Sequence, residues 1–223
     1  FSTNTLIERW EALRDLGQFN EVNIQLWPNL IPRELLKAQK RPRMRWLRQQ
    51  RGQLRVVVAS SSTPHRLIWH QQLVPALAQL LEQHPRLQLD LLGTLPLPLI
   101  LKPFQTRIRC RGQCPFSEYI QRIGESDIGL MVLEPGTFTD AKSPNRWMEF
   151  SLMGLATVLS PIRSCRELLN EGEHTLFADN SQDWVDQINK LIQHPKQRIA
   201  MARRAQRHAL KQLGSHQAAD LCR

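Results

Sequence analysis

The sequence predicts an α/β protein built on a parallel sheet with helices on both faces. Short apolar runs alternate with longer amphipathic stretches from residue 54 to residue 213, which is the pattern of parallel strands joined by crossover helices. The run at residues 128–133 is apolar without alternation, as expected for a strand that is covered on both faces. A length of 223 residues is ample for such a core and leaves the N-terminal residues outside it.

The first 31 residues are predicted to hold one helix and one strand. A Ser-Thr-Asn run at residues 2–4 can cap the helix, and Gly17 can end it. Residues 22–26 read as a short strand that stops at a Trp-Pro-Asn turn. We expect residues 1–31 to form a partial unit outside the parallel sheet. The alternative is that they decorate one complete domain.

Positive charge is concentrated in residues 33–55. The chain has a net charge of +10, and this segment alone holds seven Arg and two Lys against one Glu. Residues 33–51 read as a helix that is broken at Pro42. The segment is either a surface for anionic lipid or a phosphate-bearing acceptor, or a solvated linker whose Arg stems cover apolar surface. Nucleic acid is the weakest candidate partner, because only Trp46 is available there for base stacking.

The remaining elements follow in a regular order. Strands are expected at residues 54–59, 87–92, 106–110, 128–133, 155–159 and 174–178. Helices are expected between them, one with Leu73, Leu77, Leu80 and Leu81 on one side and others at residues 115–123, from Ser143-Pro144 onward, 163–170, 181–193 and 196–213. Residues 95–103 are the one irregular stretch and read as a packed loop.

Composition narrows the function classes. Hydrophobic residues make up 41% and charged residues 22%, and no apolar run approaches the roughly 20 residues that a bilayer crossing needs. The four Cys show no metal-ligand spacing with His, so we expect reduced thiols, no metal and a cytoplasmic protein. Contact with the inner face of the membrane is an additional hypothesis. The absence of a Gly-rich phosphate loop counts against kinases and dehydrogenases.

The segment from Asp127 to Pro161 is the most informative part of the chain. It reads as strand, loop, helix and strand, and Ser143-Pro144 is typical of a helix start. This helix N-terminus follows the carboxyl end of a parallel strand, where α/β sheets bind phosphorylated ligands. Lys142 lies just before the helix, and Arg146 and Glu149 lie in its first two turns.

These residues carry a family resemblance. The run Lys-Ser-Pro-x-Arg-Trp-Met-Glu-x-x-x-x-Gly, followed by a Val-Leu-Ser strand, resembles the donor-binding core of retaining group 1 (family 4-like) glycosyltransferases. The resemblance implies a GT-B fold in which residues 54–213 are the Rossmann-like nucleotide-sugar-binding domain. Residues 1–31 would then be the tail of an N-terminal acceptor domain that is otherwise absent, residues 32–53 a basic linker helix, and residues 214–223 a C-terminal tail.

The resemblance also assigns candidate site residues. Glu149 would hold the ribose of the nucleotide sugar, and Ser143, Asn145 and Arg146 would face its diphosphate. Ala141 departs from the family, which often has a second Glu there for the sugar. The turn after the first strand faces the same cleft. The full set is Arg66 and Lys142 as catalytic residues, and Thr63, His65, Ser143, Asn145, Arg146 and Glu149 as donor-binding residues.

Three hypotheses follow. The first is the donor-binding part of an enzyme that transfers a sugar, with retention, from a nucleotide-diphosphate sugar to an acceptor glycan or lipid-linked sugar, as in polysaccharide biosynthesis. No cofactor besides that substrate is expected, and this segment alone should transfer no sugar. The second is a non-catalytic nucleotide-binding or scaffold module of the same fold. The third is a nucleic-acid-binding protein.

Overall fold

The computed structural model describes residues 1–17, 22–39, 53–60 and 66–214. The predicted Thr63 and His65 lie outside these residues, as does most of the basic segment 33–55. Within that segment the structure shows a short helix, α2 (Arg33–Ala38), so the predicted helix 33–51 is confirmed only at its start.

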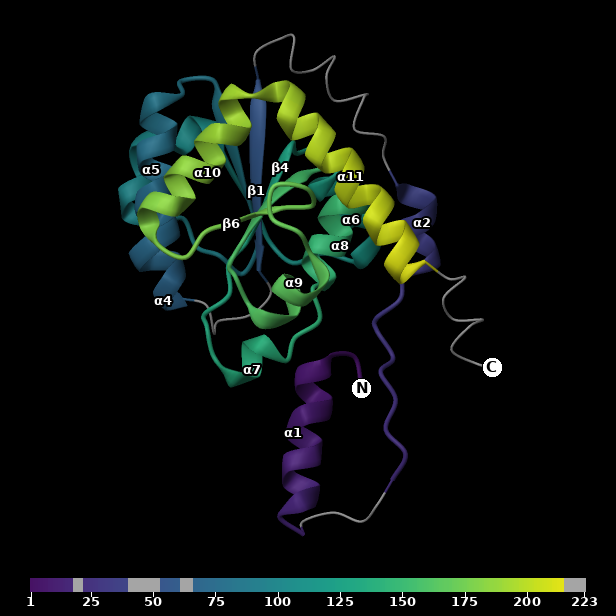
Figure 1. The fold of residues 1–223 in the computed structure, drawn as a ribbon. Coiled ribbons are helices and arrows are strands. Elements are labelled where there is room, and N and C mark those ends of the chain that lie inside the picture. The colour runs from purple at the N-terminus through teal and green to yellow at the C-terminus, as the bar shows by residue number, and fades with distance from the viewer. Residues whose placement is uncertain (18–21, 40–52, 61–65, 215–223) are drawn as a thin grey trace.

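A six-stranded sheet forms the centre of the molecule, and all of its strands are parallel (Figure 1). The spatial order is β3-β2-β1-β4-β5-β6, so the chain starts in the middle, moves to one edge and returns to build the other half. Val56 of β1 pairs with Ile128 of β4 in parallel register. The predicted fold class is therefore confirmed. The strands are β1 (Leu54–Ser60), β2 (Leu87–Gly93), β3 (Ile108–Arg111), β4 (Ile128–Met131), β5 (Ala156–Leu159) and β6 (Leu176–Phe177).

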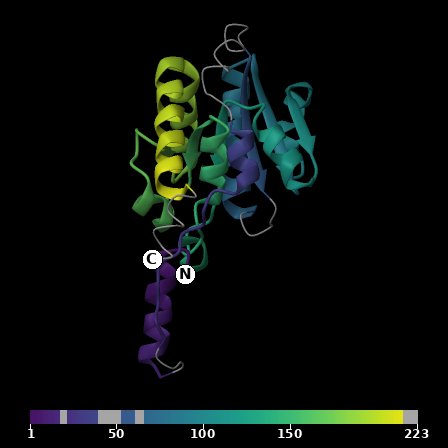
Figure 2. The same cartoon turned by 90° about the vertical axis from the view of Figure 1, so that its right-hand side faces the viewer.

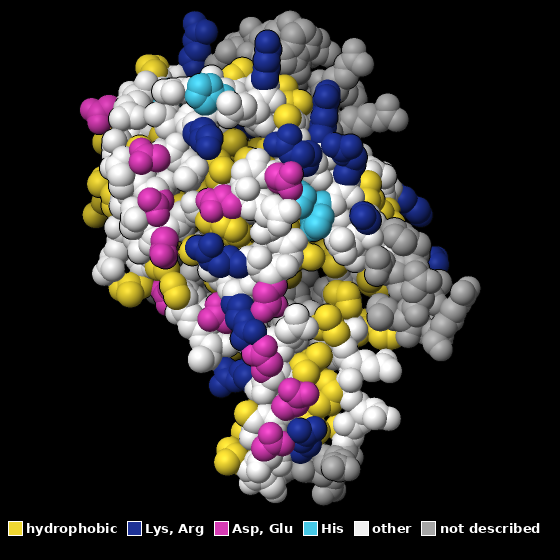
Figure 3. All heavy atoms as spheres, viewed as in Figure 1, with side chains coloured by type: hydrophobic (Ala, Val, Ile, Leu, Met, Phe, Trp, Pro, Cys, Tyr) yellow, Lys and Arg dark blue, Asp and Glu magenta, His cyan; other side chains and the backbone are white. Residues whose placement is uncertain are grey.

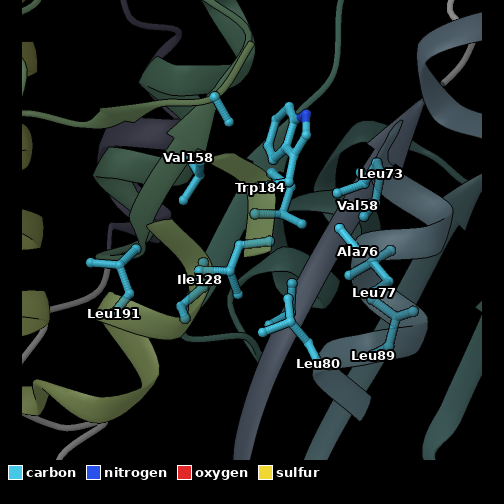
Figure 4. Packing of buried hydrophobic residues seen from close by; sticks show 14 of the residues in the cluster. Val58, Leu73, Ala76, Leu77, Leu80, Leu89, Ile128, Val158, Trp184 and Leu191 are labelled. Atoms are coloured by element: carbon cyan, nitrogen blue, oxygen red, sulfur yellow. The ribbon is translucent and has the colours of Figure 1, made fainter. Parts of the chain in front are cut away.

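The two faces of the sheet bury separate hydrophobic clusters. Val56 and Val58 point into one cluster and Val57 into the other, and all three are buried. This arrangement explains why the central strands are apolar without alternation. Figure 4 shows the first cluster, in which Trp184 and Leu191 of one helix and Leu77 and Leu80 of another lie over the same face of the sheet.

Helices cover both faces. The first face is covered by the π-helical turn η2 (Trp69–Leu73), which follows the short helix α4 (Arg66–Ile68), and by α5 (Val74–Gln83) and α10 (Ser181–Gln193). The second face is covered by α2, α6 (Phe116–Ile123), α8 (Asn145–Leu152) and α9 (Arg163–Leu168). The last helix, α11 (Pro195–Leu213), contributes Met201 and Ala202 to the first cluster and Ala205, Ala209 and Leu213 to the second.

Three predictions about local structure are wrong. Residues 22–26 are extended but belong to no strand. Their backbone contact is with the N-terminus, where the Phe1 amino group donates to Gln25 O at 2.9 Å. Residues 95–103 do not stay irregular, because a 3₁₀ helix, η3 (Leu99–Arg107), begins after Pro98 and shortens the third strand to β3. A four-residue helix, α7 (Thr137–Asp140), lies where only a loop was expected.

The N-terminal helix lies outside the sheet domain. Thr3 caps α1 (Asn4–Asp15) as predicted, since its side chain accepts a hydrogen bond from the Leu6 N–H. Figures 1 and 2 show α1 projecting away from the sheet, beyond its carboxyl edge. Glu8 of α1 pairs with Arg163 of α9, with Oε1 to Nη2 at 2.5 Å. The division of the chain into four parts stays a prediction.

Charge on the surface is uneven. Helix α11 carries six Lys and Arg and no acidic residue. In the space-filling view, Lys and Arg side chains gather over this helix, whereas acidic and basic side chains alternate elsewhere on the same face (Figure 3). Anionic surfaces or ligands are therefore favoured over cationic ones on this face.

A glycine lets α8 approach the sheet. A Cβ built on Gly129 of β4 would lie 2.4 Å from Cδ2 of Phe150, a fully buried residue of α8. No real contact is that short, and the ring has no room to move in a packed core. The spacing between β4 and α8 therefore depends on Gly129.

We expect Gly129→Ala to lower the free energy of unfolding by about 1–3 kcal/mol, because the added methyl overpacks the core. Urea denaturation measures this change. Gly112→Ala is the matched control, since a Cβ at Gly112 meets no atom within 4 Å. Equal stability losses in the two variants would contradict the role of Gly129.

A histidine pair supports α8 from its other side. The rings of His174 and His208 stack with centroids 3.9 Å apart, and Trp147 of α8 meets His208 edge-on at 6.0 Å. The His174 Nδ1 accepts a hydrogen bond from the Asn170 N–H at 3.1 Å, so this nitrogen carries no proton. Burial lowers the pKa of His174, and the neighbouring His208 and Arg204 lower it further against the opposing effect of Glu173.

We expect stability to fall as the pH drops below about 6.5, because the unfolded chain then binds a proton that folded His174 resists. His174→Asn keeps an acceptor for Asn170 but cannot titrate, so its unfolding free energy should depend less on pH between about 7 and 5. Denaturation of both proteins across this range is the measurement. Equal slopes would rule out His174 as a source of the pH dependence.

Candidate functional site

A cavity of about 270 Å³ lies at the carboxyl edge of the sheet, between the ends of β1 and β4. The strand order reverses at this point, because β1 is followed by β2 on one side and β4 lies on the other. Such switch points are where open α/β sheets bind ligands. The cavity is lined by Ala59, Ser60, Met131, Val132, Leu133, Lys142, Ser143, Asn145, Arg146 and Glu149.

The helix that carries the site begins later than predicted. Helix α8 starts at Asn145 and has Pro144 as its N-cap, with a ψ of 45° and no side-chain cap. The predicted cap by Ser143 is therefore wrong. Because Pro144 does not adopt helical angles, Ser143 lies one residue too far from the first helical N–H groups. Gly154 follows the helix with a φ of 75°, as predicted for its end.

Two residues just before α8 bring polar groups to the cavity. The Ser143 Oγ is buried and has no hydrogen-bond partner among the described residues. The Lys142 Nζ lies 4.8 Å from the centroid of the Phe138 ring, which is itself exposed. A buried hydroxyl without a partner destabilises the protein, and an anionic ligand oxygen would satisfy it. The cavity therefore combines a cation with an unsatisfied donor.

A buried triad links α6 to α8. The Tyr119 hydroxyl donates to Glu149 Oε2 at 2.8 Å and accepts a hydrogen bond from Arg146 Nη1. The same Arg146 Nη1 donates to Glu149 Oε2 at 3.1 Å, and the guanidinium lies 5.0 Å from the centroid of the Tyr119 ring. The side chains of Arg146 and Glu149 are 25% and 14% exposed, so the pair is shielded but still open to the cavity.

Burial dominates the electrostatics of this triad. It raises the pKa of Glu149, while Arg146 and Tyr119 partly offset the rise by favouring the charged carboxylate. Burial also raises the pKa of Tyr119 far above its ordinary range, so the hydroxyl stays protonated. The pKa of Arg146 is raised in spite of burial, because Tyr119 and Glu149 favour its charged form.

A second cavity of about 290 Å³ adjoins the first at the ends of β1, β2 and β3. The two cavities share Ala59, Ser60 and Arg146. The second is more apolar, and its remaining lining residues are Leu92, Gly93, Gly112, Gln113, Cys114, Phe116, Tyr119 and Arg122. Arg122 donates to Gly112 O at 3.0 Å and is paired with Glu118, so its charge is already engaged.

The loop before α8 is held from outside the site. The Thr3 hydroxyl donates to Ala141 O at 3.0 Å, and the Ser164 hydroxyl donates to Lys142 O at 2.5 Å. Asn29 donates from Nδ2 to Asn145 Oδ1 at 3.0 Å. The N-terminal residues and α9 therefore fix successive backbone and side-chain groups around Lys142 and Ser143.

Comparison with known proteins identifies the family. A family model described as glycosyl transferase-like matches residues 70–223. The chain belongs to this family. The predicted resemblance to group 1 glycosyltransferases is thus confirmed, and the match includes five of the six strands of the sheet, β2 to β6.

Solved structures of glycosyltransferases share the fold. HepE of Anabaena in complex with UDP has a TM-score of 0.65 at 19% identity, over 95% of this chain and 60% of HepE. The C-terminal domain of LpcC from Francisella tularensis, a group 1 glycosyl transferase, has a TM-score of 0.56 at 13% identity, over 78% of this chain and 92% of that domain. The pneumococcal O-GlcNAc transferase GtfA in complex with UDP and GlcNAc has a TM-score of 0.67 at 14% identity, over 99% of this chain and 43% of GtfA.

The chain spans about 53–60% of the length of the HepE structures that it matches. None of the curated proteins compared with it matches. Among the described residues, no helix has both the length and the hydrophobicity to cross a bilayer.

The structure brings most of the predicted site together. Lys142, Ser143, Arg146 and Glu149 line one cavity at the carboxyl edge, as the topology argument predicted. Their roles as donor ligands stay predictions, and so does the role of Arg66, which begins α4. At that helix start the Leu67 N–H donates to Glu134 Oε1 at 2.9 Å, a contact that the sequence did not indicate.

Tyr119 is the main residue that sequence reasoning missed. It is the only tyrosine in the chain and lies on the helix after β3, whose carboxyl end faces the same edge as the site. Its position in the sequence could have predicted that it lies near the site, because every segment that follows a parallel strand emerges at this edge. Its contact with Glu149, from a helix 30 residues away, is a tertiary one.

We expect Ser164→Ala to increase amide hydrogen exchange in residues 140–146 by about two- to tenfold, because one net hydrogen bond contributes about 0.5–1.5 kcal/mol. Ser181→Ala is the matched control, since its hydroxyl donates to a different carbonyl, Gln72 O, at 3.1 Å. Mass spectrometry of both variants gives the rates. An unchanged rate in Ser164→Ala would mean that this bond does not hold the loop.

Proposed function

We propose that the chain binds a nucleoside diphosphate sugar across the two joined cavities and serves as the donor-binding part of a retaining glycosyltransferase. One observation carries this proposal: Lys142, Ser143, Arg146 and Glu149 surround a single cavity at the switch point of a glycosyltransferase sheet. Two cations and an unsatisfied hydroxyl suit a diphosphate, and a carboxylate suits ribose hydroxyls.

The second cavity suits the nucleobase. Its lining includes the flat rings of Phe116 and Tyr119 and the apolar side chain of Leu92, and it meets the first cavity at Arg146. A base placed there would put its ribose beside Glu149 and its phosphates beside Lys142. The proposal agrees in chemistry with HepE and GtfA, which were solved with UDP.

The catalytic role of this part would be electrostatic. When the bond between the sugar and the diphosphate breaks, negative charge builds on the departing phosphate oxygens. Lys142, Arg146 and Arg66 are the cations that we assign to this charge, and preorganised cations of this kind lower the barrier most in a site shielded from water. The acceptor, a glycan or a lipid-linked sugar, would approach from a domain facing this edge. Retention of configuration is part of the proposal.

Recognition of the sugar itself is weaker here than in the family pattern. Ala141 stands where many members have a Glu, and its carbonyl is engaged by Thr3. We therefore expect the bare nucleoside diphosphate to supply most of the affinity. Ala141 also favours the second candidate function, a non-catalytic module of the same fold that binds a nucleotide without transferring a sugar.

We expect Glu149→Gln to weaken binding of a nucleoside diphosphate by about tenfold or more, because charge-assisted hydrogen bonds contribute about 1.5–3 kcal/mol each. Calorimetry with UDP, ADP and GDP, and with UDP-glucose, is the measurement. Glu171→Gln is the control, since its carboxylate accepts from the Phe177 N–H outside both cavities. If wild type and Glu149→Gln bind equally well, Glu149 is structural. Binding without transfer in a protein that includes the acceptor domain would favour the non-catalytic module.

A further inference from the structure

Both lone pairs of Glu149 Oε2 already accept a hydrogen bond from another side chain. This oxygen accepts one hydrogen bond from the Tyr119 hydroxyl and one from Arg146 Nη1. A carboxylate oxygen has two lone pairs, so a further donor can reach Oε2 only if one of these two leaves. A ribose diol that is read by both carboxylate oxygens needs such a vacancy.

Arg146 is the donor that can leave. It lines both cavities, whereas Tyr119 lines only the nucleobase side and Glu149 only the other side. A diphosphate in the first cavity offers the guanidinium a stronger and doubly charged partner. Tyr119 has no such alternative, because its buried hydroxyl stays protonated and lies between Arg146 and Glu149.

We propose, on the basis of the function proposed above, that Arg146 exchanges partners when the nucleotide binds. It leaves Glu149 Oε2 for the diphosphate, and a ribose hydroxyl takes its place on that oxygen. Tyr119 keeps its hydrogen bond to Glu149 and is the positioning residue that holds the carboxylate in place during the exchange.

The exchange makes recognition of ribose and recognition of diphosphate depend on each other. A nucleoside alone must displace Arg146 without offering it a new acceptor. A pyrophosphate alone would draw Arg146 away and leave Glu149 charged and buried beside Tyr119 only, which is unfavourable. Only a ligand that carries both groups satisfies all three residues, so the site selects nucleoside diphosphates over either fragment.

The test compares UDP with uridine on the full 223-residue chain, by calorimetry at about pH 8, because burial raises the pKa of Glu149 and a higher pH favours its ionised form. In Arg146→Met we expect UDP affinity to fall by about tenfold or more and uridine affinity to rise by about two- to tenfold. UDP affinity falls because the substitution removes a ligand of the diphosphate. Uridine affinity rises because the substitution also removes the group that competes with the ribose hydroxyl for Glu149 Oε2. Uridine affinity that falls or stays unchanged would overturn the exchange.

Arg122→Met is the matched control, because Arg122 lines the nucleobase cavity but does not contact Glu149. UDP and uridine affinities should change in the same direction there, and opposite signs in this variant would also overturn the proposal. ADP and GDP with their nucleosides are measured in parallel. A wild-type chain that binds none of the three diphosphates refutes the proposed function itself, which is a different result from binding without the change of sign.

A crystal structure of the UDP complex tests the exchange without any variant. We expect Arg146 Nη1 to contact the diphosphate, and Glu149 Oε2 to accept from a ribose hydroxyl and from Tyr119. Arg146 still hydrogen-bonded to Glu149 Oε2 in that complex would overturn the proposal.

Discussion

The parallel pairing of β1 with β4 is the constraint on which the rest of the structure depends. Both strands end at the same edge, and the chain continues from them in opposite directions along the sheet. The edge is therefore left open between them, and the loop and helix after β4 can line it. Gly129 allows α8 to lie close against β4, so the position of Arg146 and Glu149 follows from the sheet.

Charge burial is the second determinant of the site. Arg146, Glu149 and Tyr119 come from two helices, and each is stabilised by the other two. The arrangement places a carboxylate, with a cation and a hydroxyl that favour its charged form, in a shielded position next to a second cavity with a largely apolar lining. Thr3, which caps α1, and Ser164 of α9 hold the neighbouring backbone at Ala141 and Lys142, so the charged groups have a fixed frame.

The sequence predicted the sheet and the α8 segment well, because both depend on local pattern. Apolar runs, a Pro near a helix start and Gly154 at a helix end are signals within a few residues. Most of the failures depend on tertiary context, and one depends on a local backbone conformation. Residues 22–26 have strand composition but no neighbouring strand to pair with, and Ser143 fails as a cap because of the backbone angles of Pro144. The contact between Tyr119 and Glu149 was not predicted, because Tyr119 lies on another helix and only the tertiary structure brings the two together.

Helix α11 passes from one hydrophobic cluster to the other, so a single element closes both cores. The hydrophobic clusters on the two faces of the sheet therefore cannot be completed independently of each other. During synthesis, all six strands leave the ribosome before α11 does, and neither face is sealed until residues 195–213 have emerged. The nascent protein therefore exposes apolar surface of both clusters until α11 has emerged, and exposed surface of this kind is prone to aggregation.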